Sequence, residues 1–390
     1  MNTPMPNWGL LPKLIDVAAP QLALLIAFLF VFCSRNVQGE TRLWKDATGK
    51  FSVQAELIEQ DDAQVILKKS DGEQIAVPLA KLSDADRAYL QTLAQQQDQG
   101  KGVTLGKART YRVRVGMEMS TSGTATGLVG IVPIPIEWPE QTVRIVEEEK
   151  TPQVGRVTYR NLEDGARQMM ISVPKLRRGE TARATVTYEV RRHGLVGPEA
   201  TDEFRIPQRP GRDLRHYLQS GPLTNAKDAS IIAAKDKAID SVEGAWNQVR
   251  AIHDWVLDNV RYQERPEIKT AGIALQEGMG DCQELSSLFV AMCRAHGVPA
   301  RCVWIPRHSY AEFYLEDANG RGHWFPVEST NKEQFGFLPR TEIILQKGDN
   351  FKVPEYAQPL HYARTIVNAA HVKCFLPKIR RPPRSTPIDE

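Results

Sequence analysis

The sequence predicts a multidomain α+β protein, in which a small β-barrel module and a β-sandwich precede a core made of a cysteine-bearing helix packed on an antiparallel sheet. Three observations predict this fold class. Between residues 42 and 205, short runs that alternate apolar and polar residues are separated by turn residues, which is typical of strands. Apolar residues then recur at helical spacing, and three more strand-like runs follow. With 390 residues, 42% of them hydrophobic, the chain can bury two or three separate cores.

The charge of the chain argues against a nucleic-acid partner. Its formal net charge is +3, and its basic residues are interspersed with acidic ones. A broad basic face is therefore not expected. The one concentrated basic run, "PKIRRPPRSTP" near the C-terminus, is rich in Pro and lacks hydrophobic periodicity, so we predict a solvated, partly disordered tail there.

Residues 1–39 contain the apolar run "LALLIAFLFVFC", which is typical of a signal peptide or an N-terminal membrane anchor. We favour a cleaved signal, with the mature chain starting near Glu40. The anchor stays open because Ala18, Ala19 and Pro20 could lengthen the apolar stretch. Both interpretations export the rest of the chain, to the periplasm, the cell envelope or the exterior, and both confine any membrane contact to this segment.

Residues 41–93 alternate in polarity around turns such as Asp71-Gly72, which predicts a small antiparallel β-module. A polar linker, 94–107, follows and includes "QQQDQGKG". The module resembles the first homology domain of endocytic adaptor proteins, an SH3-like barrel, through Trp44, Gly49, Phe51, Ala55, Leu67, Gly72, Val77, Pro78 and Leu82. The resemblance implies that the module binds a protein partner, although an exported chain would not meet the adaptors' own partners, such as ubiquitin.

Residues 108–206 contain strand-like runs such as "YRVRVGMEM", "QTVRIVEEE" and "ARATVTYEV", and we predict a β-sandwich. No His, Cys or carboxylates stand at ligand spacing there, so its expected role is to scaffold or to guide substrate. After a connector rich in Pro and Gly, "AWNQVRAIHDWVLDNVRY" carries Ala245, Val249, Ile252, Trp255 and Val256 on one helical face. We assign 223–350 to a catalytic core and 351–390 to a C-terminal extension.

The stretch "GMGDCQELSSLFVAMCRAHGVPARCVW" places a thiol, Cys282, at the start of an apolar helix. Leu285, Leu288, Phe289 and Met292 lie on one stripe of that helix, which Gly297 and Pro299 end. The unpaired N–H groups and the positive end of the helix dipole favour a thiolate at this position. The alternative is that Cys282 is a small buried hydrophobe.

Three further runs, "ARCVWIP", "SYAEFYLE" and "HWFPVE", predict an antiparallel sheet behind the helix. His308 opens one strand and Glu328 closes its neighbour, so the turn at Asn319-Gly320 brings the imidazole and the carboxylate together. An imidazole can take the proton of a thiol and later protonate a leaving amine, while a carboxylate fixes its tautomer. The predicted catalytic residues are therefore Cys282, His308 and Glu328.

These blocks resemble the transglutaminase-like superfamily, which has a papain-like core with a Cys at a helix start, a His in an "HAW-x-E" strand and an Asp in a "VDPT" strand. The resemblance covers roughly residues 245–330, through "GDCQELSSLFVAMCRAHGVPAR" and "HSYAEFYL". The third block, "WFPVEST", departs from the pattern because Glu328 replaces Asp and Ser329 replaces Pro. The β-sandwich also looks like the N-terminal domain that often accompanies this core.

The resemblance implies acyl transfer on protein or peptide amides through a thioester at Cys282. Attack by water would make the enzyme a peptidase or amidase, which we favour, and attack by a Lys amine would make it a crosslinking transglutaminase. The departure at Glu328 leaves a third alternative, an inactive scaffold that acts through its SH3-like module.

The remaining His and Cys residues are weaker candidates. We expect His296 to cap the carbonyls at the end of the Cys282 helix and His323 to be exposed beside the hairpin turn. Cys293 and Cys302 are expected in the core, and a disulfide from Cys302 to Cys374 has no support in the sequence. Spacings for zinc or for a calcium loop are missing, so we predict no metal and no cofactor.

Overall fold

The computed structural model describes residues 35–36, 41–48, 51–60, 64–87, 89–90, 102–163, 165–264, 267–368 and 371–375. The apolar N-terminal run predicted to direct export and the basic run after residue 375 lie outside these residues. Within the described part of the chain, no helix combines the length and the apolar character needed to cross a membrane.

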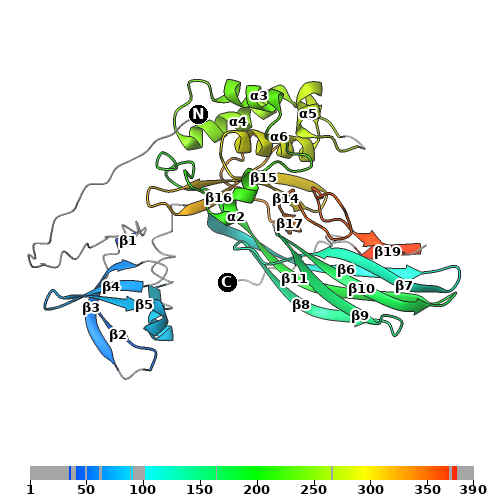
Figure 1. Ribbon diagram of the computed structural model, residues 1–390, viewed down its shortest axis with the longest axis horizontal. Helices are drawn as coiled ribbons and strands as arrows, with labels where there is room; N and C mark the ends of the chain where they lie inside the picture. The colour runs from blue at the N-terminus through cyan, green and yellow to red at the C-terminus, as the bar shows by residue number, and fades with distance from the viewer. Residues whose placement is uncertain are drawn as a thin grey trace, which may run out of the picture. The chain divides into compact units, whose positions relative to one another are not determined.

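The N-terminal module is a five-stranded sheet followed by a 3-10 helix, drawn in blue in Figure 1. The alternating pattern gives its core, since Ala55, Leu57, Val65 and Leu67 are buried. Gly72, in the predicted turn, has φ of 88°, a conformation that favours glycine. The elements are β1 (Arg35–Asn36), β2 (Arg42–Lys45), β3 (Ser52–Gln60), β4 (Gln64–Lys69), β5 (Gln74–Pro78) and η1 (Leu79–Lys81).

Two four-stranded sheets follow, and they enclose one apolar core. Their strand orders are β18-β7-β10-β9 and β19-β6-β11-β8. The segment that we assigned to a C-terminal extension supplies β18 and β19, which pair with β7 and β6 and so cover two sheet edges. The strands are β6 (Thr104–Ser120), β7 (Ala125–Ile134), β8 (Gln141–Lys150), β9 (Arg156–Leu162), β10 (Ala166–Leu176), β11 (Thr181–Val196), β18 (Ile366–Val367) and β19 (His371–Phe375).

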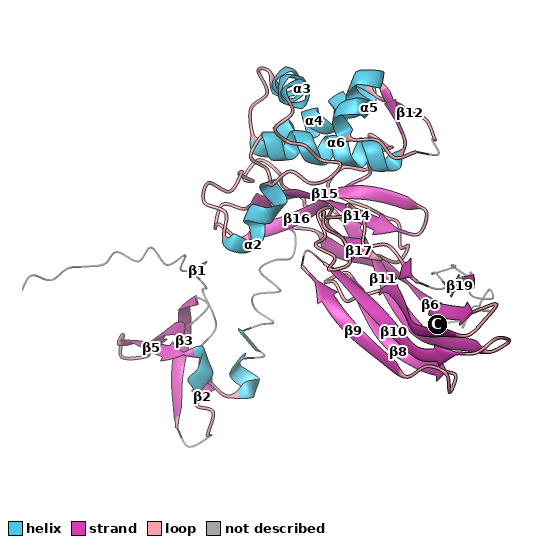
Figure 2. Ribbon diagram, turned by 45° about the vertical axis from the view of Figure 1, so that its right-hand side comes forward, coloured by secondary structure: helices cyan, strands magenta, loops and turns pink. Residues whose placement is uncertain are grey.

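The third part is a group of helices over an antiparallel sheet of order β16-β15-β14-β17 (Figures 1 and 2). Helices α3, α4 and α6 lie on one face of this sheet. The mixture of helices with several antiparallel sheets confirms the predicted α+β class. The elements are α2 (Arg212–Arg215), η2 (His216–Leu218), α3 (Ala229–Ile239), α4 (Ala245–Asn259), β12 (Arg261–Tyr262), α5 (Ala271–Glu277), β13 (Met279–Gly280), α6 (Cys282–Ala295), β14 (Ala300–Ile305), β15 (His308–Glu316), β16 (Gly322–Val327) and β17 (Gln346–Lys347).

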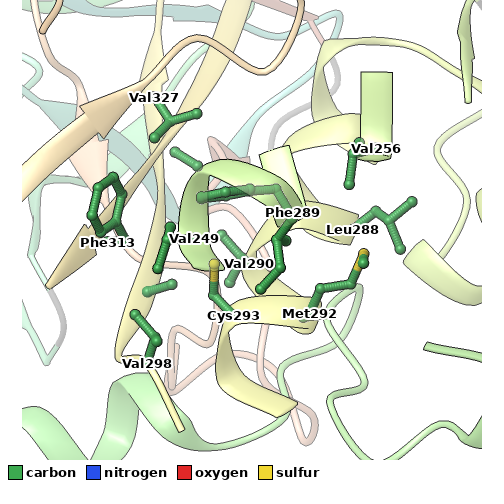
Figure 3. Packing of buried hydrophobic residues seen from close by; sticks show 14 of the residues in the cluster. Val249, Val256, Leu288, Phe289, Val290, Met292, Cys293, Val298, Phe313 and Val327 are labelled. Carbon is green, nitrogen blue, oxygen red and sulfur yellow. The ribbon is translucent and has the colours of Figure 1, made fainter. Parts of the chain in front are cut away.

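Helix α6 is the centre of this core (Figure 3). Its predicted stripe is fully inside, with Leu285 at 1% exposure and Leu288, Phe289 and Met292 at 0%. The stripe packs with side chains of α4 and of the sheet, which include Val249, Val256, Phe313 and Val327. A helix packed on several sides keeps its first residue, Cys282, in one position.

The opposite face of the β14–β17 sheet packs against the two-sheet domain. Leu195 of β11 shares an apolar cluster with Tyr310 and Ile344. Beside it, the Lys347 Nζ donates to Glu140 Oε1 at 2.7 Å and to Glu312 Oε1 at 2.6 Å. Burial opposes the charged form of Glu312, but Lys347 and Arg301 outweigh it and lower its pKa to about 2. A buried apolar and ionic interface therefore joins the two parts.

Candidate active site

The loop before Cys282 is built to present the thiol at the first helical position. Gly278, with φ of 64°, ends α5 in the left-handed conformation. A Cβ at Gly280 would lie 2.7 Å from the Cβ of Glu284, so only glycine fits this close approach. Asp281 caps α6 by accepting from the Gln283 N–H at 2.7 Å, and Glu284 accepts in return from the Asp281 N–H at 2.6 Å. Cys282 follows directly and is 7% exposed.

His308 is positioned by a tight hairpin. A two-residue loop joins β14 to β15, Arg307 within it has φ of 62°, and Ile305 and His308 form the first cross-strand pair. The His308 Nε2 lies 2.9 Å and 3.1 Å from the two carboxylate oxygens of Glu328. Because Nε2 faces the carboxylate, the nitrogen left for the hydrogen bond with the Cys282 thiol is Nδ1.

The pKa of His308 reflects these two partners. Burial alone would lower it, but the hydrogen bonds and charges of Cys282 and Glu328 outweigh burial and raise the pKa to about 9. The imidazolium form is therefore stable at neutral pH, which is the form that a thiolate needs as its partner.

Glu328 follows the last residue of β16. Continuing the β15–β16 register by one step places it opposite Tyr310, two residues from His308 and on the same face of the sheet. Its carboxylate also accepts from Thr330 Oγ1 at 2.9 Å and from Arg340 Nη1 at 2.7 Å. Burial opposes its ionisation, but His308, Arg340 and Thr330 together lower its pKa. The structure thus brings all three predicted residues together.

Sequence reasoning missed several residues around this group. The ring nitrogen Nε2 of buried His253 lies 3.0 Å from the backbone oxygen of Glu328, and burial lowers the pKa of His253. A neutral ring can donate that hydrogen bond and fix the Glu328 backbone. Tyr262 lies near Cys282. Its pKa is raised mainly by burial and secondly by the negative charge of the Cys282 thiolate. The sequence offered one signal of this group, which is that His253 is a lone polar residue within the apolar face of the predicted helix.

A cavity of about 440 Å³ adjoins these residues. Leu285, one helical turn after Cys282, and Thr330, which bonds Glu328, both line it. Its other lining residues lie at the end of α4, along β12 and on two nearby loops: Leu257, Asp258, Asn259, Val260, Arg261, Tyr262, Gly278 and Lys332. The cavity therefore lies next to the catalytic group, separated from Cys282, His308 and Glu328 themselves by Leu285 and Thr330.

The structure confirms one of the weaker candidates and corrects another. His296 caps the end of α6 through its backbone N–H, and its ring Nε2 lies 2.9 Å from Gln248 Oε1 of α4. The prediction that His323 is exposed is wrong. His323 is only 8% exposed, because Asp317 Oδ2, at 3.3 Å, and the ring of Phe204 enclose it.

The other thiols differ from Cys282. Cys293 and Cys302 are buried, as predicted, and burial raises the pKa of both. Neither forms a disulfide, and Cys374 is a free thiol as well. Across the described residues, no group of three or more His, Cys, Asp or Glu side chains could hold a metal ion.

Comparisons with known proteins agree with the two sequence resemblances. Residues 233–329 match the family model of the transglutaminase-like superfamily, and residues 35–98 match that of SLA1 homology domain 1, SHD1. No curated protein matches the chain.

Three solved structures are similar to parts of the chain. The first is a candidate cysteine protease from Cytophaga hutchinsonii, with 17% identity and a TM-score of 0.47, covering 70% of this chain and 92% of the other. The second is the periplasmic domain of TgpA from Pseudomonas aeruginosa, with 14% identity, a TM-score of 0.30 and coverages of 60% and 94%. The third is a candidate protease from Parabacteroides distasonis, with 11% identity, a TM-score of 0.22 and coverages of 75% and 62%. The chain thus contains an SHD1 domain and, around Cys282, His308 and Glu328, a transglutaminase-like domain.

Proposed function

We propose that the protein is a thiol-dependent acyl-transfer enzyme that acts on protein or peptide amides, with hydrolysis as its main reaction. The observation that carries the proposal is the position of His308, between the Cys282 thiol and the Glu328 carboxylate, with a pKa raised to about 9. Cys282 is the nucleophile, His308 the general base and acid, and Glu328 the group that orients the imidazole.

In the first half of the reaction, His308 Nδ1 takes the thiol proton and the Cys282 Sγ attacks the carbonyl carbon of the substrate. The negative charge moves to the carbonyl oxygen. Cys282 is the first residue of α6, so its backbone N–H has no acceptor within the helix and can bond this oxygen. Tyr262, whose raised pKa keeps its hydroxyl protonated, is a second donor candidate. His308 then protonates the amide nitrogen, the C–N bond breaks, and the amine leaves a thioester on Cys282.

In the second half, a nucleophile attacks the thioester and His308 takes its proton. Water gives a free acid, and a Lys amine gives an isopeptide bond. We favour water because the 440 Å³ cavity beside the site is open to solvent, and water is always present in it. The crosslinking reaction remains the alternative outcome of the same acyl-enzyme.

The same cavity is a suitable place for the substrate segment that flanks the scissile amide. Val260 and Leu285, which are buried, form an apolar floor, while Asp258, Arg261 and Lys332 are exposed. An apolar side chain of the substrate would fill the floor and leave its backbone beside Cys282. The SHD1 domain would bind a separate protein partner.

Two reactions on one protein substrate test the proposal. Fluorescently labelled casein, incubated with the enzyme, should yield small peptides, and a biotinylated primary amine should be incorporated only weakly. Both signals should disappear in Cys282→Ala. Strong amine incorporation without new peptides would assign crosslinking instead. If iodoacetamide labels Cys282 no faster than exposed Cys374, the core is an inactive scaffold.

A further inference from the structure

Residues 336–345 form a segment, here called the strap, that leaves the catalytic domain after Phe335 and returns to it at β17. The two-sheet domain holds the strap near both ends. Leu338 and Leu195 of β11 exchange backbone hydrogen bonds of 2.9 Å and 2.7 Å. Further along, the Ile344 N–H donates to Gln141 Oε1 at 2.6 Å, and the Ile344 carbonyl accepts from Gln141 Nε2 at 2.9 Å.

The middle of the strap reaches the candidate catalytic site. Its Arg340 donates from Nη1 to Glu328 Oε2 at 2.7 Å, and its Nε lies 3.6 Å from Glu342 Oε2. The Glu328 side chain is only 5% exposed, so this bond is shielded from solvent on one side. A charge-assisted bond to a nearly buried carboxylate restricts how that carboxylate can rotate.

We propose that Arg340 is a positioning residue for the His308–Glu328 pair, and that the two-sheet domain sets this alignment through the strap. The inference rests on the proposed function, since it concerns the efficiency of the same site. The carboxylate uses one oxygen mainly for His308 and Thr330 and the other for Arg340. Without Arg340 the carboxylate keeps its contact with the imidazole but can rotate, because Thr330 alone does not fix its plane, and the ring is then held less firmly toward the thiol.

The charged and titratable groups that face this pair come from three elements. Cys282 of α6 faces His308, Arg340 of the strap faces Glu328, and His253 of α4 contacts the Glu328 backbone. Removing the cation Arg340 leaves the negative charge of Glu328 less compensated. The imidazolium of His308 then becomes more stable, so its deprotonation moves to higher pH.

The first test compares Arg340→Gln with Arg340→Lys. We expect Arg340→Gln to lower kcat/KM and the rate of Cys282 alkylation by iodoacetamide about tenfold, as misplacement of a catalytic group does. Arg340→Lys should recover part of this loss. With iodoacetate, an anion that the His308 imidazolium attracts, the upper pH midpoint of alkylation should rise in Arg340→Gln only. If a smaller fraction of Arg340→Gln is alkylated while its pH midpoint stays unchanged, the variant has a folding defect and the proposal is overturned.

The second test moves the strap from the other domain. A Cβ at Gly194 of β11 would lie 2.8 Å from the backbone oxygen of Pro339, the residue before Arg340, so Gly194→Ala must displace the strap. Gly123→Ala is the matched control, because a Cβ there meets no atom within 4 Å. We expect Gly194→Ala to slow Cys282 alkylation severalfold and Gly123→Ala to leave it unchanged.

A double variant decides whether the two effects share one route. If the domain acts through Arg340, Gly194→Ala should add little to Arg340→Gln. If the two substitutions lower the alkylation rate by factors that multiply in the double variant, the coupling between the two-sheet domain and Arg340 is overturned. Tyr111→Phe, which removes only the 3.2 Å bond to Thr341 of the strap, provides a milder variant if Gly194→Ala does not fold. Rapid alkylation of wild-type Cys282 with no change in any variant would refute this inference alone, whereas slow alkylation of the wild type would refute the proposed function.

Discussion

The substitution Glu328→Gln keeps the size of the side chain but removes its charge, and the hydrogen bonds of Glu328 predict why the variant loses activity. Wild-type Glu328 accepts from donors on both oxygens, namely His308 and Thr330 on one side and Arg340 on the other. An amide has one oxygen and one NH₂ group. If the oxygen faces His308, the NH₂ group faces the Arg340 guanidinium, donor against donor. If the oxygen faces Arg340, the NH₂ group faces Nε2 of His308, which must then carry its proton on Nδ1 and cannot accept from the thiol.

The pKa of His308 sets the size of the effect. Its rise from 6.5 to about 9 corresponds to roughly 3 kcal/mol in favour of the imidazolium, shared between Cys282 and Glu328. If Glu328 supplies half of this, loss of its charge slows reaction about tenfold, and the wrong tautomer adds to the loss. We therefore expect kcat/KM to fall between about tenfold and a thousandfold.

The pH dependence of Cys282 alkylation by iodoacetate, an anion that the His308 imidazolium attracts, provides the assay. The raised pKa keeps His308 protonated up to pH about 9 in the wild type, so the upper limit of the ion pair lies there and should move to lower pH in Glu328→Gln. The free energy of unfolding, measured in urea, should change much less than the rate. An unchanged rate together with an unchanged upper limit would show that another group orients His308, or that Cys282 and His308 work as a dyad.

Four further predictions concern single residues. Iodoacetamide should label Cys282 first, as mass spectrometry of the peptides would show; predominant labelling of a buried thiol would contradict the assignment. His308→Ala should lower kcat/KM by about a hundredfold to ten-thousandfold while the far-UV circular dichroism stays unchanged, and an active variant would refute its role. Lys347→Met should lower the free energy of unfolding by about 3 kcal/mol, because it removes the buried cation that bonds both Glu140 and Glu312 and leaves Glu312 with Arg301 alone, whereas loss of the exposed pair in Arg144→Ala should cost much less. Glu312 makes the stability depend on pH, because its pKa of about 2 lies below the usual 4.5. Its stabilisation is present above pH 4.5 and is lost as the pH falls toward 2. A free energy of unfolding that stays constant over this range would contradict the prediction.

The sequence predicted the residues whose positions follow from local rules. Cys282 follows a loop that contains glycines and opens an apolar stripe, and His308 and Glu328 flank a hairpin with a recognisable turn, so helical periodicity and turn chemistry were enough to predict that they meet. Arg340 lies in a segment without periodicity, and only the docking of the strap on a distant domain gives it a role. His323 was misjudged for the same reason, since Phe204, more than a hundred residues earlier in the chain, is what covers it. Long-range packing leaves no periodic signal in the sequence.

The glutamate at position 328, which departs from the Asp typical of the superfamily, matches the geometry around it. The Glu328 backbone is held on both sides, since its N–H donates to the Gln334 carbonyl at 2.9 Å and its own carbonyl lies 3.0 Å from the His253 Nε2. A backbone fixed in this way cannot move toward His308, which lies diagonally across the two strands. The side chain must therefore supply the reach, and the longer glutamate does so while its second oxygen still meets Arg340 at 2.7 Å. An aspartate, about 1.5 Å shorter, would have to give up either the imidazole or the guanidinium. The longer carboxylate and Arg340 are consequently parts of one arrangement, and we expect Glu328→Asp to retain only part of the activity.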